Sequence, residues 1–272
     1  MKACFFVCLV VFFISCAHKN NEIKHPDMPV SKEVPDSQKL LTANDAATIL
    51  SRKQIPVLCY HHIRNTKAGD YVVPLKIFAE QMQALADSGY KTILPDELYN
   101  YLKTDASLPQ KAVMLTFDDT DLEQFTVGVP EMNKHNFKGV FFIMNISIGR
   151  PRYINREQLK QLSDDGNLVA AHTWDHHRVT EYTDADWDKQ LNEARQKLET
   201  IIGKPVKYFA YPFGLWNVDA IEQLHSRKIK MAFQLSARRD STNAIYTVRR
   251  MLVPGTWTTK GLFKAMKKTF DL

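Results

Sequence analysis

Residues 112–119 read AVMLTFDD, and this stretch decides the fold. Four apolar residues in a row, followed by Thr116 and Phe117, indicate a strand that is buried on both faces. The strand runs directly into Asp118 and Asp119, whose neighbouring negative charges repel each other. A bound divalent cation removes this conflict, because it takes one carboxylate as a ligand and leaves the other free to act as a base.

Apolar runs of strand length recur along the chain, and amphipathic helices alternate with them. The runs are 55–60, 112–117, 139–144, 168–171, 208–211 and 231–235, and the clearest helical faces lie within 75–85 and 187–201. Nearly continuous apolar strands with helical crossovers predict an α/β fold with a parallel sheet, either a (β/α) barrel or a doubly wound sheet. The sequence shows no internal repeat, so we expect a single domain over residues 55–272.

Histidines follow a second predicted strand. Residues 168–171 read LVAA and lead into His172, and His176 lies four residues further along. In both candidate architectures, function collects at the carboxyl ends of the strands. Two imidazoles face one cation if the segment turns helically, and with one carboxylate they make a metal site that has open positions. Either half alone is a weak signal, but the two together at successive strand ends predict a metal-dependent active site.

These motifs resemble those of the polysaccharide deacetylase family, also called the NodB-homology or carbohydrate esterase family 4 domain. The resemblance covers roughly residues 55–255, and the motif variants are most similar to those of poly-N-acetylglucosamine deacetylases of biofilm polysaccharides. The matching segments are VLCYHH (57–62), TFDD (116–119), KGVFFI (138–143), HTWDH (172–176) and YPFG (211–214).

The resemblance implies a distorted (β/α) barrel that removes N-acetyl groups from a glycan with the help of one divalent transition metal, usually zinc. Carried over residue by residue, Asp119, His172 and His176 bind the metal, and Asp118 is the general base. The backbone N–H of Phe213 holds the oxyanion.

The chain departs from the family pattern at positions that matter for catalysis. Many members have an Arg that orients the base, but Ala210 stands there, and Arg249 or Arg250 is the candidate replacement. Thr120 stands where the first motif is usually followed by Gly. The family's last motif supplies a His as general acid, yet no histidine follows His225 in this chain.

Three histidines remain as proton donors for the leaving amine, which is a poor leaving group unless it is protonated. They are His61, His62 and His177. We rank His61 first, because the end of the first strand opens on the same barrel face as Asp118. His177 is also an alternative to His176 as a metal ligand.

Aromatic residues near the motifs are candidates for stacking on sugar rings. Trp174, inside the histidine motif, is the strongest of them, and Tyr211 opens the third motif. Tyr71, Trp216 and Trp257 are further candidates. For each of these residues, packing in the core is the competing interpretation.

The N-terminus resembles the signal of an exported lipoprotein. A short apolar run over residues 4–14 precedes Cys16, and this run is too short to span a bilayer comfortably. We expect residues 1–16 to be a lipoprotein-type signal peptide, with Cys16 lipidated and attached to a membrane of the bacterial envelope. A plain secretory signal and a retained anchor are the alternatives. Residues 17–54 are polar and predict a tether, with a short helix expected near residues 44–52.

Charge and cysteine content exclude other classes of protein. The 36 Lys and Arg against 30 Asp and Glu give a formal charge of +6, without a basic block, so we expect no nucleic-acid partner. If Cys4 and Cys8 leave with the signal and Cys16 is acylated, the domain keeps only Cys59, which rules out a disulfide framework. Cys59 lies in an apolar run and is expected to be a buried thiol.

Three functions remain open from the sequence. The leading one is an N-deacetylase acting on an extracytoplasmic amino-sugar polymer, such as poly-N-acetylglucosamine or peptidoglycan. An O-acetyl esterase acting on xylan or another glycan would use the same metal centre. A non-catalytic glycan-binding protein would explain the missing Arg and His, but binding alone does not need Asp118. The sequence leaves the oligomeric state open.

Overall fold

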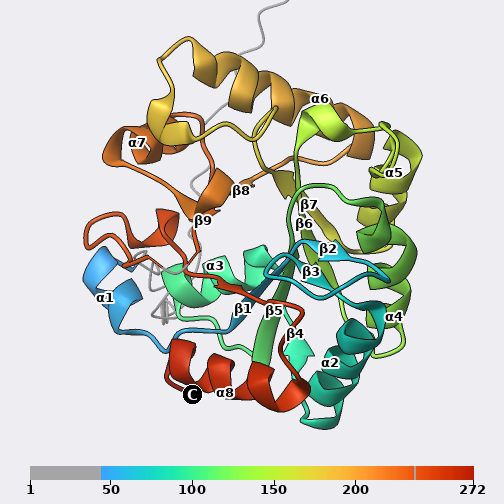
Figure 1. Cartoon of the computed structure of the whole chain (residues 1–272). Coiled ribbons are helices and arrows are strands. Elements are labelled where there is room, and N and C mark those ends of the chain that lie inside the picture. The colour runs from blue at the N-terminus through green and yellow to red at the C-terminus, as the bar shows by residue number, and fades with distance from the viewer. Residues whose placement is uncertain (1–43, 236) are drawn as a thin grey trace, which may run out of the picture. The chain divides into compact units, whose positions relative to one another are not determined.

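A parallel sheet of eight strands organises the chain (Figure 1). The computed structural model describes residues 44–235 and 237–272. The strands are β1 (Val57–Tyr60), β4 (Lys91–Thr92), β5 (Ala112–Phe117), β6 (Gly139–Ile143), β7 (Leu168–Ala171), β8 (Tyr208–Ala210), β9 (Met231–Phe233) and β10 (Met251–Leu252). Their order is β10-β1-β5-β6-β7-β8-β9, with β4 paired to the start of β5. Two further short strands, β2 (His62–Ile63) and β3 (Val72–Val73), form a separate pair.

The sheet curls until its last strands meet its first. After β9 the chain returns, and the N–H of Val248 donates to the carbonyl of Ala232 at 3.0 Å. A few residues later β10 pairs with β1, with Met251 opposite Leu58. The backbone bonds therefore run from β9 through the segment before β10 to β1. The predicted (β/α) barrel, in distorted form, is confirmed, and the doubly wound alternative is excluded.

Helices supply the crossovers that parallel strands require. They are α1 (Ala46–Ser51), α2 (Leu75–Asp87), α3 (Pro95–Thr104), α4 (Val129–Asn133), α5 (Arg156–Asp164), α6 (Ala194–Ile202), α7 (Val218–Ser226) and α8 (Thr259–Phe270). In Figure 1, α2, α4, α5, α6 and α8 surround the strands. Both predicted helical faces are buried. The face within 75–85 is buried through Phe78, Met82 and Leu85, and the face within 187–201 through Trp187, Leu191 and Leu198.

Alternate residues of each strand point to opposite faces of the sheet, and this alternation decides what enters the barrel. One set faces the inside of the barrel and belongs to the same apolar cluster as residues of α1 and α3. This set includes Val57, Met114, Phe142, Ala170, Tyr208, Ala210 and Phe233. The other set lies under the outer helices and includes Leu58, Tyr60, Val113, Leu115, Val169, Phe209 and Tyr211. If the same alternation continues past the strand ends, it places Cys59, His61, Asp118 and His172 on the inward side.

The packed part of the chain begins earlier than the predicted boundary at residue 55. Helix α1 buries Ile49 against the domain, and the amide of Asn44 donates to the carbonyl of Leu102 at 2.9 Å. The short helix expected near residues 44–52 is present, but it packs against the domain and is not part of a tether. The predicted signal peptide and most of the predicted tether lie outside the described residues. No helix among the described residues is both long and apolar enough to cross a membrane.

Candidate active site

Polar side chains from separate strands meet in a cavity of about 360 Å³. His61 follows β1, Asp118 follows β5 and His172 follows β7, so each stands at the carboxyl end of a strand, as the sequence predicts. The cavity is lined by His61, His62, Tyr71, Asp118, Asp119, His172, His176, Phe213, Gly214, Leu235 and Arg250.

A sharp turn of the backbone brings Asp119 into the same cavity. Continued alternation would place Asp119 on the side opposite Asp118, but its φ is 71° and that of Thr120 is 66°. Both values lie in the left-handed region, where an extended strand ends. The positive φ explains why a Gly is expected at the position of Thr120. The Thr120 hydroxyl accepts the N–H of Met144 at 2.8 Å, which ties the turn to the neighbouring strand.

Asp119, His172 and His176 offer three ligand atoms in one place. Asp119 Oδ1 lies 3.5 Å from His172 Nε2 and 3.4 Å from His176 Nε2. Asp119 Oδ1 and His172 Nε2 are buried and find no hydrogen-bond partner among the described residues. Unpaired buried polar atoms are costly, and one divalent cation held by a carboxylate and two imidazoles would satisfy both. The predicted ligand set therefore fits a metal ion.

The two histidines do not meet through the helical turn that their spacing suggested. Thr173 and His176 have φ values of 65° and 67°, so the segment after β7 is a tight loop. Thr173 Oγ1 accepts the N–H of His176 at 2.9 Å and holds this loop. His172 Nδ1 lies 2.8 Å from the carbonyl oxygen of Ala210, which assigns the ring proton to Nδ1. Nε2 of His172 is then free to act as a metal ligand.

Charges around the triad act on its two histidines in opposite directions. Burial lowers the pKa of His172, but the carboxylates of Asp118 and Asp119 outweigh burial, and the pKa is raised. Burial and the neighbouring His172 lower the pKa of His176 to about 4. Without a metal, His176 is therefore neutral at pH 7, which is the state that a metal ligand needs.

Asp118 is held by Arg250, one of the two arginines that the sequence offered. Arg250 Nη1 donates to Asp118 Oδ1 at 2.6 Å and Nη2 donates to Oδ2 at 2.8 Å. The buried guanidinium also donates to the Thr116 hydroxyl and to the carbonyl of Gln234. Burial alone would raise the pKa of Asp118, but Arg250 lowers it well below its usual range. Arg249, the other candidate, does not line the cavity.

The structure separates the three candidate proton donors. His61 lines the cavity, and burial lowers its pKa. His62 also lines the cavity, but its Nδ1 lies 2.8 Å from a carboxylate oxygen of Asp121. The side chain of His177 is 74% exposed, lies 2.8 Å from Asp175 and does not line the cavity. His177 is therefore placed neither to protonate a leaving group nor to replace His176 as a ligand.

Phe213 lies at the cavity as the third motif predicts. Its side chain is 52% exposed, and its ring centroid lies 4.6 Å from that of His176. The backbone φ of Phe213 is 60°, and its N–H donates to no acceptor among the described residues. This N–H is therefore free to face an oxyanion. Tyr71, which is 53% exposed, also lines the cavity.

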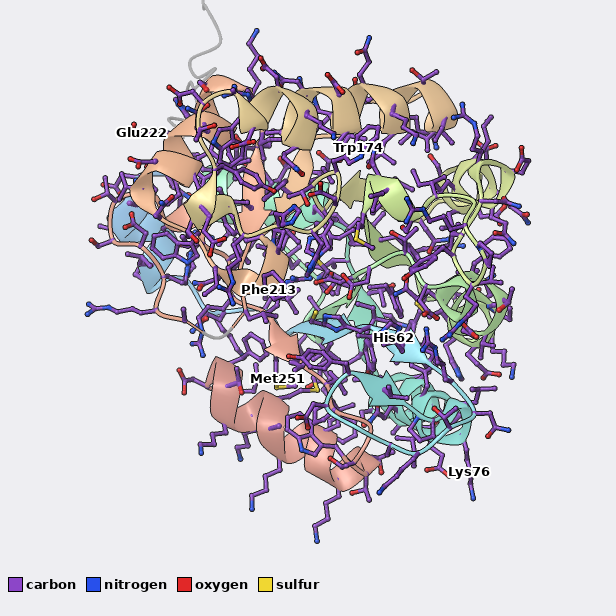
Figure 2. The ribbon with its side chains drawn as sticks, turned by 45° about the horizontal axis from the view of Figure 1, so that its top comes forward. His62, Lys76, Trp174, Phe213, Glu222 and Met251 are labelled. Atoms are coloured by element: carbon purple, nitrogen blue, oxygen red, sulfur yellow. The ribbon has the colours of Figure 1, made fainter. Side chains whose placement is uncertain are left out.

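Two other predicted sugar-binding aromatics are placed elsewhere. Tyr211 is fully buried on the outward side of the sheet, with its ring 5.4 Å from that of Phe209, so the prediction that it contacts substrate is not met. Trp174 does not line the cavity. The ammonium groups of Lys197 and Lys189 lie 4.8 and 5.8 Å from its ring, and Figure 2 shows Trp174 near α6 while Phe213 and His62 lie closer to the centre of that view.

Sequence reasoning missed two contacts of Asp118. Cys59 is fully buried, as expected, but its Sγ also lies 3.6 Å from Asp118 Oδ2. Gln124 Nε2 donates to the backbone carbonyls of Asp118 and His61. The alternation along β1 gives Cys59 the inward direction and could have placed it. Gln124 lies on a helical turn after the motif, and no local pattern singles it out.

Comparison with known proteins finds a family model that matches part of the chain. Residues 105–232 match the sequence model described as polysaccharide deacetylase. That range includes Asp118, Asp119 and both histidines of the triad. Over these residues the chain is similar to the polysaccharide deacetylase family.

Proteins that are named as deacetylases match most of the chain. YxkH of Bacillus subtilis (strain 168), whose name gives it as a candidate polysaccharide deacetylase, is 25% identical over 89% of this chain and 88% of its own. The poly-beta-1,6-N-acetyl-D-glucosamine N-deacetylase of Staphylococcus aureus (strain MRSA252) is 25% identical over 68% of each. The solved structure of IcaB from Ammonifex degensii is 27% identical and has a TM-score of 0.67, covering 74% of this chain and 92% of that one.

At Ala210, where the chain departs from the polysaccharide deacetylase pattern, the structure shows another residue in the role of the missing Arg. Ala210 has the inward direction on β8 that an Arg would need to reach Asp118. Arg250 reaches the same carboxylate from the segment that closes the barrel beside β1. In this chain the guanidinium on Asp118 therefore comes from the segment before β10 and not from β8.

Proposed function

We propose that the protein is a metal-dependent hydrolase that removes N-acetyl groups from an extracytoplasmic amino-sugar polysaccharide. The observation that carries the proposal is the division between two adjacent carboxylates. Asp119 faces two histidines, whereas Asp118 is ionised and held by a guanidinium. A protein that only binds glycans needs no base, so this division favours catalysis. Similarity to a poly-beta-1,6-N-acetyl-D-glucosamine N-deacetylase supports a poly-N-acetylglucosamine-like substrate, with peptidoglycan as the second choice.

Asp119, His172 and His176 would hold one divalent transition metal, and their ligand atoms suit zinc. When bound, this ion supplies Lewis acidity at the acetyl carbonyl and lowers the pKa of the attacking water. This chemistry matters because the lowered pKa of Asp118 makes that carboxylate a weak base.

Asp118 accepts a proton from water as the water oxygen bonds to the acetyl carbon. Arg250 fixes the direction of the carboxylate during this transfer. The Phe213 N–H faces the negative charge that develops on the acetyl oxygen. His61 then gives a proton to the sugar nitrogen as the C–N bond breaks, and the products are acetate and a free amine. The exposed rings of Tyr71 and Phe213 would flank the sugar at the mouth of the cavity.

Acetate release tests this proposal directly. Purified protein with a known metal content is incubated with poly-N-acetylglucosamine, chitin oligomers, peptidoglycan and acetylxylan. We expect release from an N-acetylated polymer, and none from the Asp118→Asn protein. Release from acetylxylan alone would make the protein an O-acetyl esterase. Absence of release from all four substrates by the metal-loaded protein would leave a glycan-binding role.

We also propose that the protein is attached to a membrane through a lipidated Cys16. The support is the apolar run over 4–14 that precedes Cys16 and the polar segment that follows it. Cys16→Ser should release the protein from the membrane fraction or leave its signal uncleaved. A mass spectrum with an unmodified N-terminus at another residue would contradict lipidation.

A further inference from the structure

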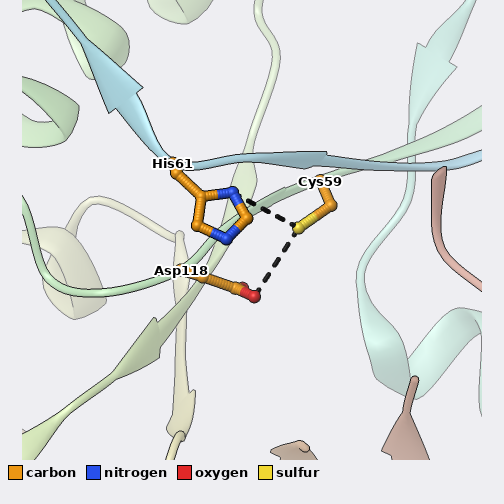
Figure 3. Close-up of side chains that lie close together, drawn as sticks. All are labelled: Cys59, His61 and Asp118. Atoms are coloured by element: carbon orange, nitrogen blue, oxygen red, sulfur yellow. Dashed lines mark hydrogen bonds between the residues drawn. The ribbon is translucent and has the colours of Figure 1, made fainter. Parts of the chain in front are cut away.

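A second group of metal-ligating side chains lies beside the triad. It consists of Cys59, His61 and Asp118, and Figure 3 shows the thiol to one side of the imidazole and the carboxylate, with a dashed line to each. Cys59 Sγ lies 3.6 Å from Asp118 Oδ2 and 4.0 Å from His61 Nδ1. One ligand atom from each of the three residues lies within 4.8 Å of the others. None of these residues belongs to the ligand triad of the proposed catalytic metal.

The spacing of these atoms is close to that of a tetrahedral thiolate site. Zinc bonds to sulfur at about 2.3 Å and to nitrogen or oxygen at about 2.0–2.2 Å, so a tetrahedral angle separates sulfur from either atom by roughly 3.5 Å. The observed separations of 3.6 and 4.0 Å come near this value without movement of the backbone. A shift of the His61 ring alone would bring the third ligand into place.

We propose that Cys59, His61 and Asp118 form a second, inhibitory site for a thiophilic divalent cation. The inference rests on the proposed function, because inhibition requires that Asp118 and His61 act in the hydrolysis. Binding breaks the S–H bond of Cys59, releases that proton to solvent and forms a sulfur–metal bond. Soft thiolate ligands favour zinc and similar ions over magnesium or calcium.

The second site should fill after the first. Arg250 already binds both oxygens of Asp118, so a cation at this carboxylate meets a positive charge at close range. Burial also raises the pKa of the Cys59 thiol well above its usual value, so removing its proton has a cost. No guanidinium among the described residues pairs with Asp119, and Asp119 Oδ1 and His172 Nε2 have no hydrogen-bond partner there.

An ion in the second site would stop the reaction at its proton transfers. Asp118 Oδ2 lies 3.8 Å from His172 Nε2, so this oxygen faces both metal positions. A cation bound there occupies the electron pair that would accept the proton from water. The same ion takes up a nitrogen of His61, the proposed proton donor. Both His61 and Asp118 line the cavity, which gives the ion a path to the buried thiol.

A cobalt titration tests the site in the full chain with Cys4, Cys8 and Cys16 replaced by serine, so that Cys59 is the sole thiol. Cobalt(II) reports a thiolate ligand through a charge-transfer band in the near ultraviolet. We expect no such band during the first equivalent and a band during the second. Acetate release should fall in the same range by about 10²-fold or more, because a base and an acid are both lost.

The matched control is the same protein with Cys59→Ser, which keeps a hydroxyl donor toward Asp118. Its charge-transfer band should be absent, and its ratio of rates at excess and at one equivalent should stay near unity. Cys59→Ala serves if the serine variant does not fold. A band that is absent, or that grows from the first equivalent, would overturn the proposal, as would inhibition equal in both proteins. If no substrate is deacetylated, the proposed function fails while the band still reports on the site.

Discussion

Asp118 and Asp119 are neighbours in the chain, yet they stand in different surroundings. Asp118 is almost fully buried. Its two oxygens accept hydrogen bonds from two N–H groups of Arg250 and from the thiol of Cys59. The side chain of Asp119 is 23% exposed and has one oxygen between two imidazole nitrogens, without a donor from the described residues. Arg250 compensates the charge of Asp118. Asp119 is instead placed to bind a cation together with the two histidines.

The difference shows that position on the strand, and not residue type, sets the chemistry of each carboxylate. Asp118 keeps the inward direction of β5 and so meets the interior guanidinium of Arg250. Asp119 enters the cavity only because the strand stops in a left-handed turn. Arg250 compensates the charge of Asp118, and a cation held by Asp119 and the two histidines would compensate the other charge. The predictions below separate these two environments, beginning with the largest expected effect.

Removal of one triad ligand should affect activity most. His172→Ala takes away a buried nitrogen that points at Asp119, so the protein should lose stoichiometric metal. Lewis acidity contributes several kcal/mol to such reactions, so kcat should fall by roughly 10³-fold or more. Metal analysis of the dialysed protein and acetate release check this. Full metal content with full activity would remove the triad from the account, and His177→Ala, which alters an exposed ring, is the control.

Loss of Arg250 should chiefly lower stability. Arg250→Gln leaves a buried carboxylate without its cation, which typically lowers the free energy of unfolding by about 3–5 kcal/mol. In the wild type the pKa of Asp118 lies below 3.8, so the ion pair stabilises the fold fully above that pH and loses its contribution as pH falls. In the variant, burial still raises the pKa of Asp118 and Arg250 no longer lowers it, so this pKa should lie above its wild-type value.

The difference in unfolding free energy between wild type and Arg250→Gln should therefore be largest at neutral pH and shrink on acidification. Urea unfolding of the metal-free proteins at several pH values measures it. Arg249→Gln, at the neighbouring position outside the cavity, should change stability far less. A gap that stays constant with pH would show that Arg250 acts through packing and not through Asp118.

His61 should distinguish amide from ester substrates. An amine leaves only when protonated, whereas an alkoxide is a better leaving group, so His61→Ala should lower N-deacetylation by about 10²-fold and O-deacetylation of a matched sugar less. Burial lowers the pKa of His61, so the acid form should be lost, and N-deacetylation decline, as pH rises through a value below 6.5. Equal losses on both substrates with metal retained would make His61 structural.

The smallest effect should separate two aromatics. Phe213→Ala removes an exposed ring at the cavity and should raise KM by a few-fold, in line with about 0.5–1.5 kcal/mol for aromatic stacking. Trp174 lies under Lys197 and outside the cavity. The KM of the Trp174→Ala protein should therefore match that of the wild type. Steady-state kinetics on one N-acetylated oligomer decides this. A larger KM change for Trp174→Ala than for Phe213→Ala would place the sugar on the α6 side.

The sequence predicted the sheet and the triad because both leave local signals. Apolar runs of strand length marked the core, and Asp119 and His172 followed two of those runs. The alternation of residues also explains one failure, since Tyr211 follows Ala210 and must point outward when Ala210 points inward. Counting directions along β8 would have excluded Tyr211 as a contact of the substrate.

Long-range contacts could not be predicted in this way. Arg250 reaches a carboxylate 132 positions away, and only closure of the barrel brings them together. Trp174 lies within the histidine motif, yet a loop with left-handed residues turns it toward Lys197. Helix α1 packs through Ile49 inside a polar segment, so composition placed the start of the domain too late. In each case a contact distant in sequence overrides the local pattern.

Metal content and turnover of two matched variants, Asp118→Asn and Asp119→Asn, test the division of roles most directly. Each change removes one charge and keeps the size of the side chain. We predict that Asp118→Asn holds stoichiometric metal and loses about 10²- to 10⁴-fold in kcat, the contribution of a general base. Asp119→Asn should lose the metal. Metal lost from Asp118→Asn and retained in Asp119→Asn would contradict the assignment of base and ligand.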